Sequence, residues 1–128
     1  MITPSEVVLV ACGGALGATA RFLIGRASDA FLASLAFPVA TLLINVLGCF
    51  MIGGVAEVSA RGDISPHTRL LIATGILGGF TTFSAFGLET ATLLRSGHII
   101  LALTYITTSV VGGVLATYAG IIAFTPRS

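Results

Sequence analysis

Charged side chains are scarce in this sequence, and lysine and tryptophan are absent from it. Only 9% of the 128 residues are charged and the mean hydropathy is +1.07, whereas about 25% charged residues is usual in a soluble domain. The formal net charge of +1 argues against a nucleic-acid-binding protein, because such a protein needs a clustered basic surface. The scarcity of charge therefore indicates that the solvent of this chain is a lipid bilayer.

Cysteines and groups that could form a catalytic site are also few. Cys12 and Cys49 lie within apolar runs and have neither the spacing of metal ligands nor that of a disulfide framework. We expect both to be small buried hydrophobic residues. The polar connections contain His67 and His98 but no Ser/His/Asp or metal-binding constellation. An enzyme is therefore the least favoured class.

In place of charge, the sequence has four long apolar stretches. A helix needs about 20 mainly apolar residues to cross the hydrocarbon layer of a membrane. The stretches that approach or exceed this length cover residues 7–24, 37–58, 70–94 and 99–124. No basic segment precedes the first stretch, which is also longer than the core of a signal peptide, so we expect a membrane span there rather than a cleaved leader. The sequence predicts one all-α, four-span integral membrane domain over residues 1–128.

Small residues are dense in the first, second and fourth stretches. In lipid, small side chains let helices approach closely and pack by van der Waals contact. This density favours contacts with another subunit, but packing within one chain also accounts for it.

The arginines divide almost evenly between the two sides of the predicted bundle. Arginine and lysine asymmetry sets the orientation of a membrane protein. Three arginines lie on the side of the N-terminus and two or three on the other side: Arg61, Arg69 and Arg127, against Arg26, Arg95 and, just inside its span, Arg21. This balance predicts dual topology, with chains that insert both ways and pair antiparallel.

The third stretch contains residues that weaken a helix near its middle, in "GGFTTFSAF", residues 78–86. Gly78 and Gly79 permit a break, and the β-branched pair Thr81 and Thr82 weakens the helix further. A break in the membrane exposes backbone groups that protein, ions or a water-filled path must satisfy. An unbroken helix, whose hydroxyl groups bond back to preceding carbonyls, fits the spacing equally well.

Phe80, Phe83 and Phe86 recur every three residues, so a continuous helix would place them along one face. Packing is the ordinary reason for such a stripe. However, Thr82 and Ser84 interleave with the rings, and the edges of aromatic rings carry partial positive charge. Ring edges beside hydroxyl donors would be able to replace water around a small anion.

Polar side chains in the other stretches bear on the same hypothesis. Asn45, near the centre of the second stretch, either hydrogen-bonds to another helix or donates to an anion. Tyr105 and Ser109 place two hydroxyl groups on one face of the fourth stretch. Arg21 either snorkels to the membrane interface or lines a vestibule that concentrates anions. We expect Glu89 to be a rim or packing residue rather than a proton relay.

Three motifs resemble the signatures of one family of membrane proteins. "GGALGATARF" is similar to a first-span signature that ends in Gly-Ala-x-x-Arg. "FPVATLLINVLGCFMIG" and "TGILGGFTTFSAFGLET" resemble the signatures of the second and third spans. On these motifs the chain resembles the Fluc (CrcB) family of fluoride channels over essentially its whole length, and the third-span motif is the most specific of them.

This resemblance implies a passive fluoride-selective channel that exports fluoride and so relieves its toxicity. It implies an antiparallel dual-topology homodimer in the inner cell membrane, with two pores and a third helix broken at mid-membrane. A structural Na⁺ on the dimer axis would be held by the backbone carbonyls of Gly78 and Thr81. The implied fluoride pore consists of Asn45, Phe83, Phe86, Ser84, Tyr105 and Ser109, and Arg21 would lie at the vestibule. One turn beyond Ser109 the chain has Gly113, so the polar track is not defined further.

The main alternative is a proton-coupled exporter of the small multidrug-resistance type, which also has four spans and often dual topology. That mechanism needs a carboxylate deep in the membrane. The first stretch has none after Glu6, and Glu57 and Glu89 lie near the ends of their stretches. The sequence therefore favours the channel.

Overall fold

The computed structural model of the chain describes residues 2–32 and 35–126, and these residues are almost entirely helical. In chain order the elements are α1 (Pro4–Leu32), α2 (Val39–Ala60), α3 (Pro66–Arg69), the π-helix η1 (Leu70–Leu77), α4 (Gly78–Phe80), α5 (Phe83–Arg95) and α6 (Ile99–Phe124). Within the described ranges, four helical stretches are long and apolar enough to cross a membrane: Pro4–Ser28, Val39–Ala60, Pro66–Arg95 and Ile99–Phe124. Each overlaps one of the stretches expected from the sequence.

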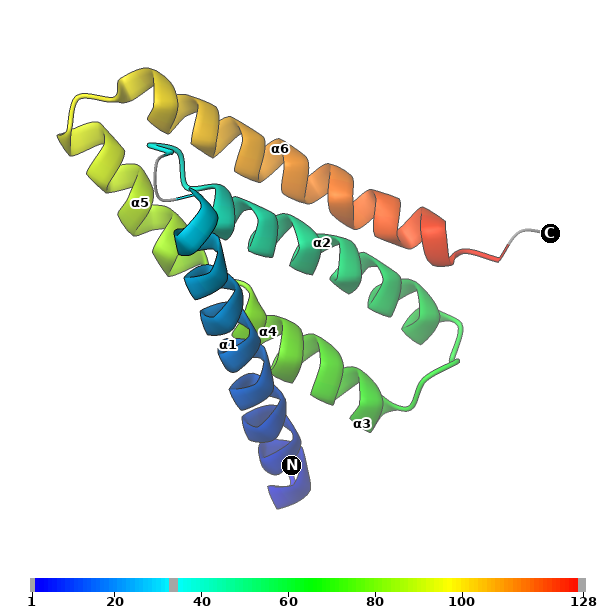
Figure 1. Ribbon diagram of the computed structural model, residues 1–128. Helices are drawn as coiled ribbons and strands as arrows, with labels where there is room; N and C mark the ends of the chain where they lie inside the picture. The colour runs from blue at the N-terminus through cyan, green and yellow to red at the C-terminus, as the bar shows by residue number, and fades with distance from the viewer. Residues whose placement is uncertain (1, 33–34, 127–128) are drawn as a thin grey trace.

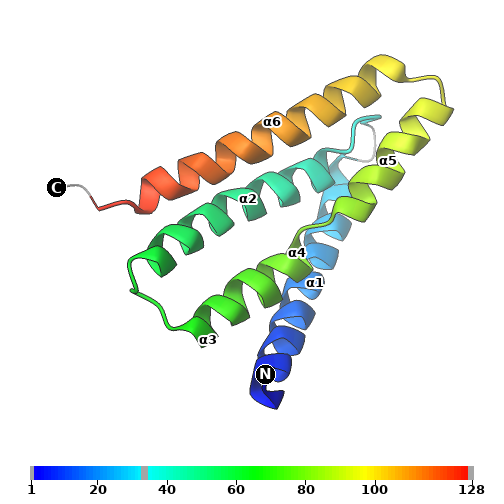
Figure 2. The same cartoon turned by 180° about the vertical axis from the view of Figure 1, so that it is seen from behind.

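The helices form two closely packed pairs. α2 lies along α6, while α1 crosses the rod made by α3, η1 and α4 (Figure 1). Seen from behind, α5 continues beyond α4 in nearly the same direction and packs against α6 (Figure 2). The N-terminus, the α2–α3 connection and the end of α6 lie at one end of the bundle, and the α5–α6 connection lies at the other (Figures 1 and 2). Arg127, which entered the count of charges at the first end, is outside the described residues.

Glycines bring both pairs into backbone contact. A Cβ atom on Gly53 of α2 would lie 2.1 Å from the carbonyl oxygen of Thr117 on α6. A Cβ on Gly17 of α1 would lie 2.0 Å from the carbonyl oxygen of Ile76. Neither position has room for a side chain, so at least part of the small-residue density serves packing within the chain, which is one of the two explanations that the sequence left open.

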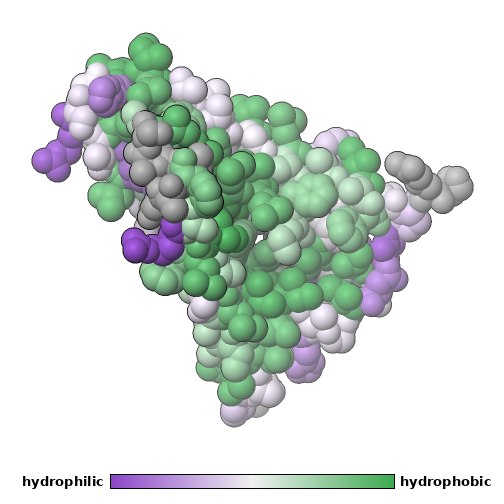
Figure 3. Space-filling view, in the orientation of Figure 1, coloured by the Kyte–Doolittle hydropathy of each residue, from purple (hydrophilic) through white to green (hydrophobic). Residues whose placement is uncertain are grey.

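The outward surface of the bundle is largely apolar. In Figure 3 hydrophobic residues cover the middle of the face, and hydrophilic residues gather toward its ends. Cys12 belongs to the exposed surface and Cys49 is partly buried, so the expectation that both are buried is wrong for Cys12. The physical reason is that α1 meets the bundle along its glycine face, and Cys12 is displaced from that face by one residue beside Gly13.

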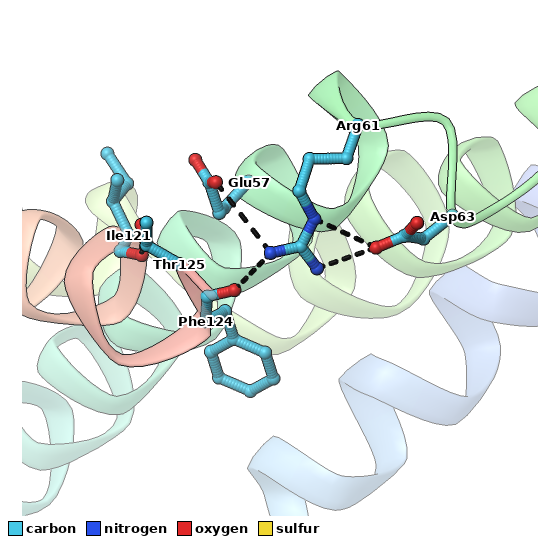
Figure 4. Close-up of polar contacts among 6 residues, drawn as sticks. All are labelled: Glu57, Arg61, Asp63, Ile121, Phe124 and Thr125. Atoms are coloured by element: carbon cyan, nitrogen blue, oxygen red, sulfur yellow. Dashed lines mark hydrogen bonds and ion pairs between the residues drawn. The ribbon is translucent and has the colours of Figure 1, made fainter. Parts of the chain in front are cut away.

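Arg61 joins the ends of α2 and α6 (Figure 4). Its Nε lies 2.8 Å and its Nη2 2.6 Å from Oδ2 of Asp63, and its Nη1 lies 3.8 Å from Oε1 of Glu57. Nη1 also donates to the carbonyl oxygen of Phe124, in the last turn of α6. Carbonyls in a last turn have no intrahelical donor, and a cation there is favourable. This cluster therefore holds together the ends of the two helices that pack most extensively.

The helix ends differ most from the sequence expectation after the first apolar stretch. α1 continues to Leu32, so most of residues 25–34, expected as the first connection, is helical. Apolar character stops near residue 24 and Gly25 follows it, yet the helix continues through this glycine, because hydropathy marks the boundary with water rather than the end of backbone hydrogen bonding. The other two connections turn at Gly62 and Gly97, whose φ angles of +79° and +78° suit glycine best.

Candidate functional site

The third membrane-length helix is interrupted between α4 and α5. Thr81 (φ −79°, ψ 158°) and Thr82 (φ −150°, ψ 111°) have extended backbones, as suits β-branched residues. Phe80 is buried on α4, and Phe83 and Phe86 lie beyond the interruption on α5. The three phenylalanines therefore do not share one continuous helical face.

Asn45 of α2 satisfies the extended backbone at Thr82. Its Nδ2 donates to the Thr82 carbonyl oxygen over 3.1 Å, and its Oδ1 accepts from the Thr82 amide over 2.8 Å. The structure thus gives Asn45 the inter-helix hydrogen bond that was one of its two expected roles. An amide nitrogen carries two hydrogens, and the contact with Thr82 uses one of them.

The two threonines meet other polar groups of the interruption. The amide and hydroxyl of Thr81 both donate to the carbonyl oxygen of Leu77, each over 3.0 Å. The hydroxyl oxygen of Thr82 accepts from the amide of Ala85 over 3.2 Å and so caps the start of α5. The side chains predicted to weaken the helix are therefore also the ones that satisfy its ends.

Arg21 of α1 reaches the interruption from the opposite side. Its Nε donates to the carbonyl oxygen of Gly79 over 3.1 Å, and the contact is partly buried. The sequence suggested an interfacial or vestibule position for Arg21. In the structure its guanidinium is bonded to the last turn of α4.

The carbonyls of Gly78 and Thr81 remain without a donor. Within the described residues no hydrogen bond reaches either oxygen. In a continuous helix the Gly78 carbonyl would accept from the amide of Thr82, but that amide donates to Asn45. The carbonyl of Phe80 also lacks a donor, yet Phe80 does not line the neighbouring groove, whereas Gly78 and Thr81 do.

This groove, of about 530 Å³, runs between α2, the interrupted helix and α6. Most of its wall is apolar. It brings together six of the residues that the sequence singled out: Asn45, Gly78, Thr81, Phe83, Phe86 and Ser109. Arg21, Ser84 and Tyr105 do not line it.

Two phenyl rings and a hydroxyl group line the groove. The rings of Phe83 and Phe86 have centroids 5.4 Å apart and planes inclined by 45°. Phe83 is 83% exposed in the single chain. The hydroxyl oxygen of Ser109 is buried, and among the described residues it has no hydrogen-bond partner. Together with the Asn45 side chain, the Ser109 hydroxyl makes a polar strip in this otherwise apolar groove.

Tyr105 lies behind this strip rather than in the groove. Its side chain is fully buried, and its hydroxyl donates to Oε2 of Glu89 over 2.7 Å. Thr41 donates to Oε1 of the same carboxylate over 2.7 Å, and the rings of Tyr105 and Phe86 are 5.1 Å apart. Glu89 thus connects α2, α5 and α6. Sequence reasoning missed this contact, although a lone carboxylate between apolar residues signals a need for donors.

Ser84, which the resemblance also assigns to the pore, does not line the groove of the single chain. It is exposed on α5, and its hydroxyl oxygen lies 3.3 Å from that of Thr82. Thr104 and Thr108 donate to carbonyls of their own helix, over 2.8 Å in each case, as expected for hydroxyl groups in a membrane helix.

Four apolar helices of membrane-spanning length, three of which line a groove with a polar strip, define a small multi-pass membrane protein. Comparison with protein families matches residues 8–121 to the family described as "CrcB-like protein, Camphor Resistance (CrcB)". The chain belongs to this CrcB family, which confirms the resemblance seen in its motifs.

Individual relatives agree with this assignment. The fluoride-specific ion channel FluC of Prosthecochloris aestuarii is 47% identical over 117 residues, which are 91% of this chain and 90% of the relative. The protein of the same name from Methylobacillus flagellatus is 45% identical over 116 residues, 90% of this chain and 91% of its own. That from Chlorobium luteolum is 45% identical over 126 residues, 98% and 96% of the two chains.

Proposed function

We propose that this protein is a passive fluoride channel of the inner cell membrane and not an enzyme. The observation that carries the proposal is the groove, where Asn45, Phe83, Phe86 and Ser109 come together. The relatives named above are called fluoride-specific ion channels, and their identity covers nearly the whole chain.

The chemistry of the groove suits a small, strongly hydrated anion. Wherever water is stripped from fluoride, the wall must offer compensation. The ring edges of Phe83 and Phe86 supply partial positive charge, the Ser109 hydroxyl has a hydrogen to donate, and Asn45 has one N–H beyond the bond to Thr82. None of these groups carries a full charge, so an ion that enters is able to leave.

Fluoride efflux from proteoliposomes that contain only this protein tests the proposal. We expect fluoride to leave passively, at a rate that grows with the protein-to-lipid ratio, while chloride under the same gradient is retained. Protein-free liposomes measure the leak. Efflux no faster than this leak, from protein that is folded and inserted, would contradict a channel.

We further propose that the channel is an antiparallel homodimer in which a second copy covers the groove. Two features of the single chain support this arrangement. Phe83 presents its ring outward beside the groove. Gly78 has an ordinary helical conformation (φ −62°, ψ −37°), and a Cβ there would meet nothing closer than 3.9 Å. Its own chain therefore does not require glycine at this position, whereas a closely approaching partner would.

Dual topology means that some molecules insert in one orientation and others in the opposite orientation, so each end of the bundle is found on both sides of the membrane. A tag at the C-terminus should be accessible from each side of the membrane in comparable amounts, because the arginines are nearly balanced. Adding two or three lysines to one end should shift the population toward one orientation. A single orientation of the unmodified chain would contradict the antiparallel dimer, unless an oppositely oriented partner chain is supplied.

A structural Na⁺ is the third part of the proposal, and it would be held by the Gly78 and Thr81 carbonyls at the interruption, in the middle of the membrane. The carbonyls without donors support it, because unwound backbone and helix C-terminal ends are known Na⁺ ligands in membrane proteins. Two such oxygens from each of two copies would surround the cation on the dimer axis. The ion would supply positive charge that stabilises the C-terminal end of α4.

Substitutions at these two positions test whether the interruption binds Na⁺. Thr81→Ser keeps the carbonyl and the hydroxyl, so we expect Na⁺-dependent fluoride efflux to be unchanged. Gly78→Val should weaken the Na⁺ dependence through crowding between copies, since the single chain itself has room for a Cβ atom at this position. The measurement is efflux as a function of Na⁺ concentration, with N-methylglucamine as the replacing cation. If fluoride efflux through the unmodified protein does not change with Na⁺ concentration, even after prolonged removal of Na⁺, the proposed Na⁺ site is contradicted.

A further inference from the structure

Arg21 holds the last turn of α4 from a neighbouring helix. Its Nε donates to the carbonyl oxygen of Gly79 over 3.1 Å, in a partly buried contact. This carbonyl lies just before the extended residues Thr81 and Thr82, where the carbonyls of α4 lose the amides that would follow in a continuous helix. A guanidinium at such a C-terminal end both donates a hydrogen bond and opposes the negative end of the helix dipole.

Glycine contacts bring Arg21 to this carbonyl. Gly17 lies one turn before Arg21 and therefore on the same face of α1. A Cβ on Gly17 would be 2.0 Å from the carbonyl oxygen of Ile76, and a Cβ on Gly79 would be 2.4 Å from that of Gly14. The two backbones touch along this face, so the distance from the Arg21 side chain to α4 is fixed by packing.

We propose that Arg21 is a positioning residue for the interruption rather than an anion-attracting residue of a vestibule. Arg21 fixes Gly79 from α1, and Asn45 fixes Thr82 from α2. Held from both sides, the backbone between these anchors keeps the carbonyls of Gly78 and Thr81 at the groove. The consequence for conduction rests on the proposed channel function, but the anchoring of the backbone does not.

Two substitutions separate the hydrogen bond of Arg21 from its charge. Arg21→Gln removes the charge, but the glutamine amide nitrogen is as many bonds from Cα as the arginine Nε and keeps an N–H there. Arg21→Lys keeps the charge and places a methylene at that position. Arg26→Gln and Arg26→Lys are the matched controls, since Arg26 is exposed on the same helix.

The primary measurement is hydrogen–deuterium exchange of the peptide covering residues 77–84 in lipid nanodiscs. We expect R21Q, which keeps a neutral donor, to exchange only about two- to threefold faster than the unmodified protein, and R21K to exchange about tenfold faster, the change that corresponds to losing one charge-assisted hydrogen bond. Fluoride efflux should follow the same order, with R21K about tenfold slower than R21Q. If R21K does not fold, Arg21→Met, which also lacks the donor, takes its place and should exchange as fast.

A vestibule role predicts the reverse: R21K would conduct normally, R21Q would lose flux, and both would exchange like the unmodified protein. Slow exchange in R21K, or exchange in R21Q as fast as in R21K, would overturn the positioning role. Exchange requires no fluoride. If the unmodified protein carried no fluoride, the proposed function would fail while the exchange data still decided the role of Arg21.

Discussion

Replacing Phe83 by isoleucine is expected to remove most fluoride flux and to leave the fold intact. Phe83 is 83% exposed in the single chain, so its ring has few contacts within that chain to lose. Isoleucine keeps apolar bulk at the groove but has no ring edge with partial positive charge. The expected loss of flux therefore comes from the missing ring edge and not from a loss of packing.

Phe86→Ile should also remove most of the flux, with an added loss of stability. The Phe86 ring packs against Tyr105, with centroids 5.1 Å apart, as well as against Phe83. A change of side-chain shape in such a contact costs roughly 1–3 kcal/mol of unfolding free energy. Of the two variants, Phe83→Ile is thus the cleaner test of a ring-lined pore.

The measurement is fluoride efflux from proteoliposomes, together with size-exclusion chromatography of the same samples. Leu88→Ile is the matched control, because Leu88 is exposed on the same helix but outside the groove, and it should conduct normally. Normal efflux from both phenylalanine variants, with assembly unchanged, would show that the rings serve packing alone.

The four spans could be predicted because hydropathy measures the property that the bilayer selects. Helix ends were harder to predict. α1 extends to Leu32, beyond the apolar stretch, because backbone hydrogen bonding continues where hydropathy falls. The π-helical geometry of Leu70–Leu77 was not predicted either. It lies where Gly13 and Gly17 bring α1 into contact with this backbone, and such contacts between distant segments leave no local pattern.

The residue types of the site were visible in the sequence, but their partners were not. Asn45 and Thr82 are 37 residues apart, and Arg21 and Gly79 are 58 apart. Tyr105, for example, is buried in the single chain and donates to Glu89. A polar side chain in an apolar stretch indicates that a hydrogen-bond partner lies nearby in the fold. Which residue is that partner depends on how the helices cross.

Asn45→Asp is expected to lower fluoride efflux to the leak of protein-free liposomes. The Thr82 backbone presents one donor and one acceptor to Asn45. An ionised aspartate would accept from the Thr82 amide but would oppose the Thr82 carbonyl, and its charge would repel an anion in the groove. A protonated aspartic acid has a single O–H, which the Thr82 carbonyl would take. In neither state does a hydrogen remain for fluoride, whereas Asn45 has one to spare.

Exchange of the Thr82 amide, measured beside efflux, distinguishes the two ways in which Asn45→Asp can fail. Slow exchange with no flux means that the clamp on Thr82 persists and that the missing hydrogen, or the added negative charge, stops the ion. Fast exchange with no flux means that the clamp itself has opened. Cys49→Ser, at another residue that lines the groove from α2, is the control and should conduct normally. Flux near that of the unmodified protein would mean that Asn45 acts only on Thr82 and donates nothing to the ion.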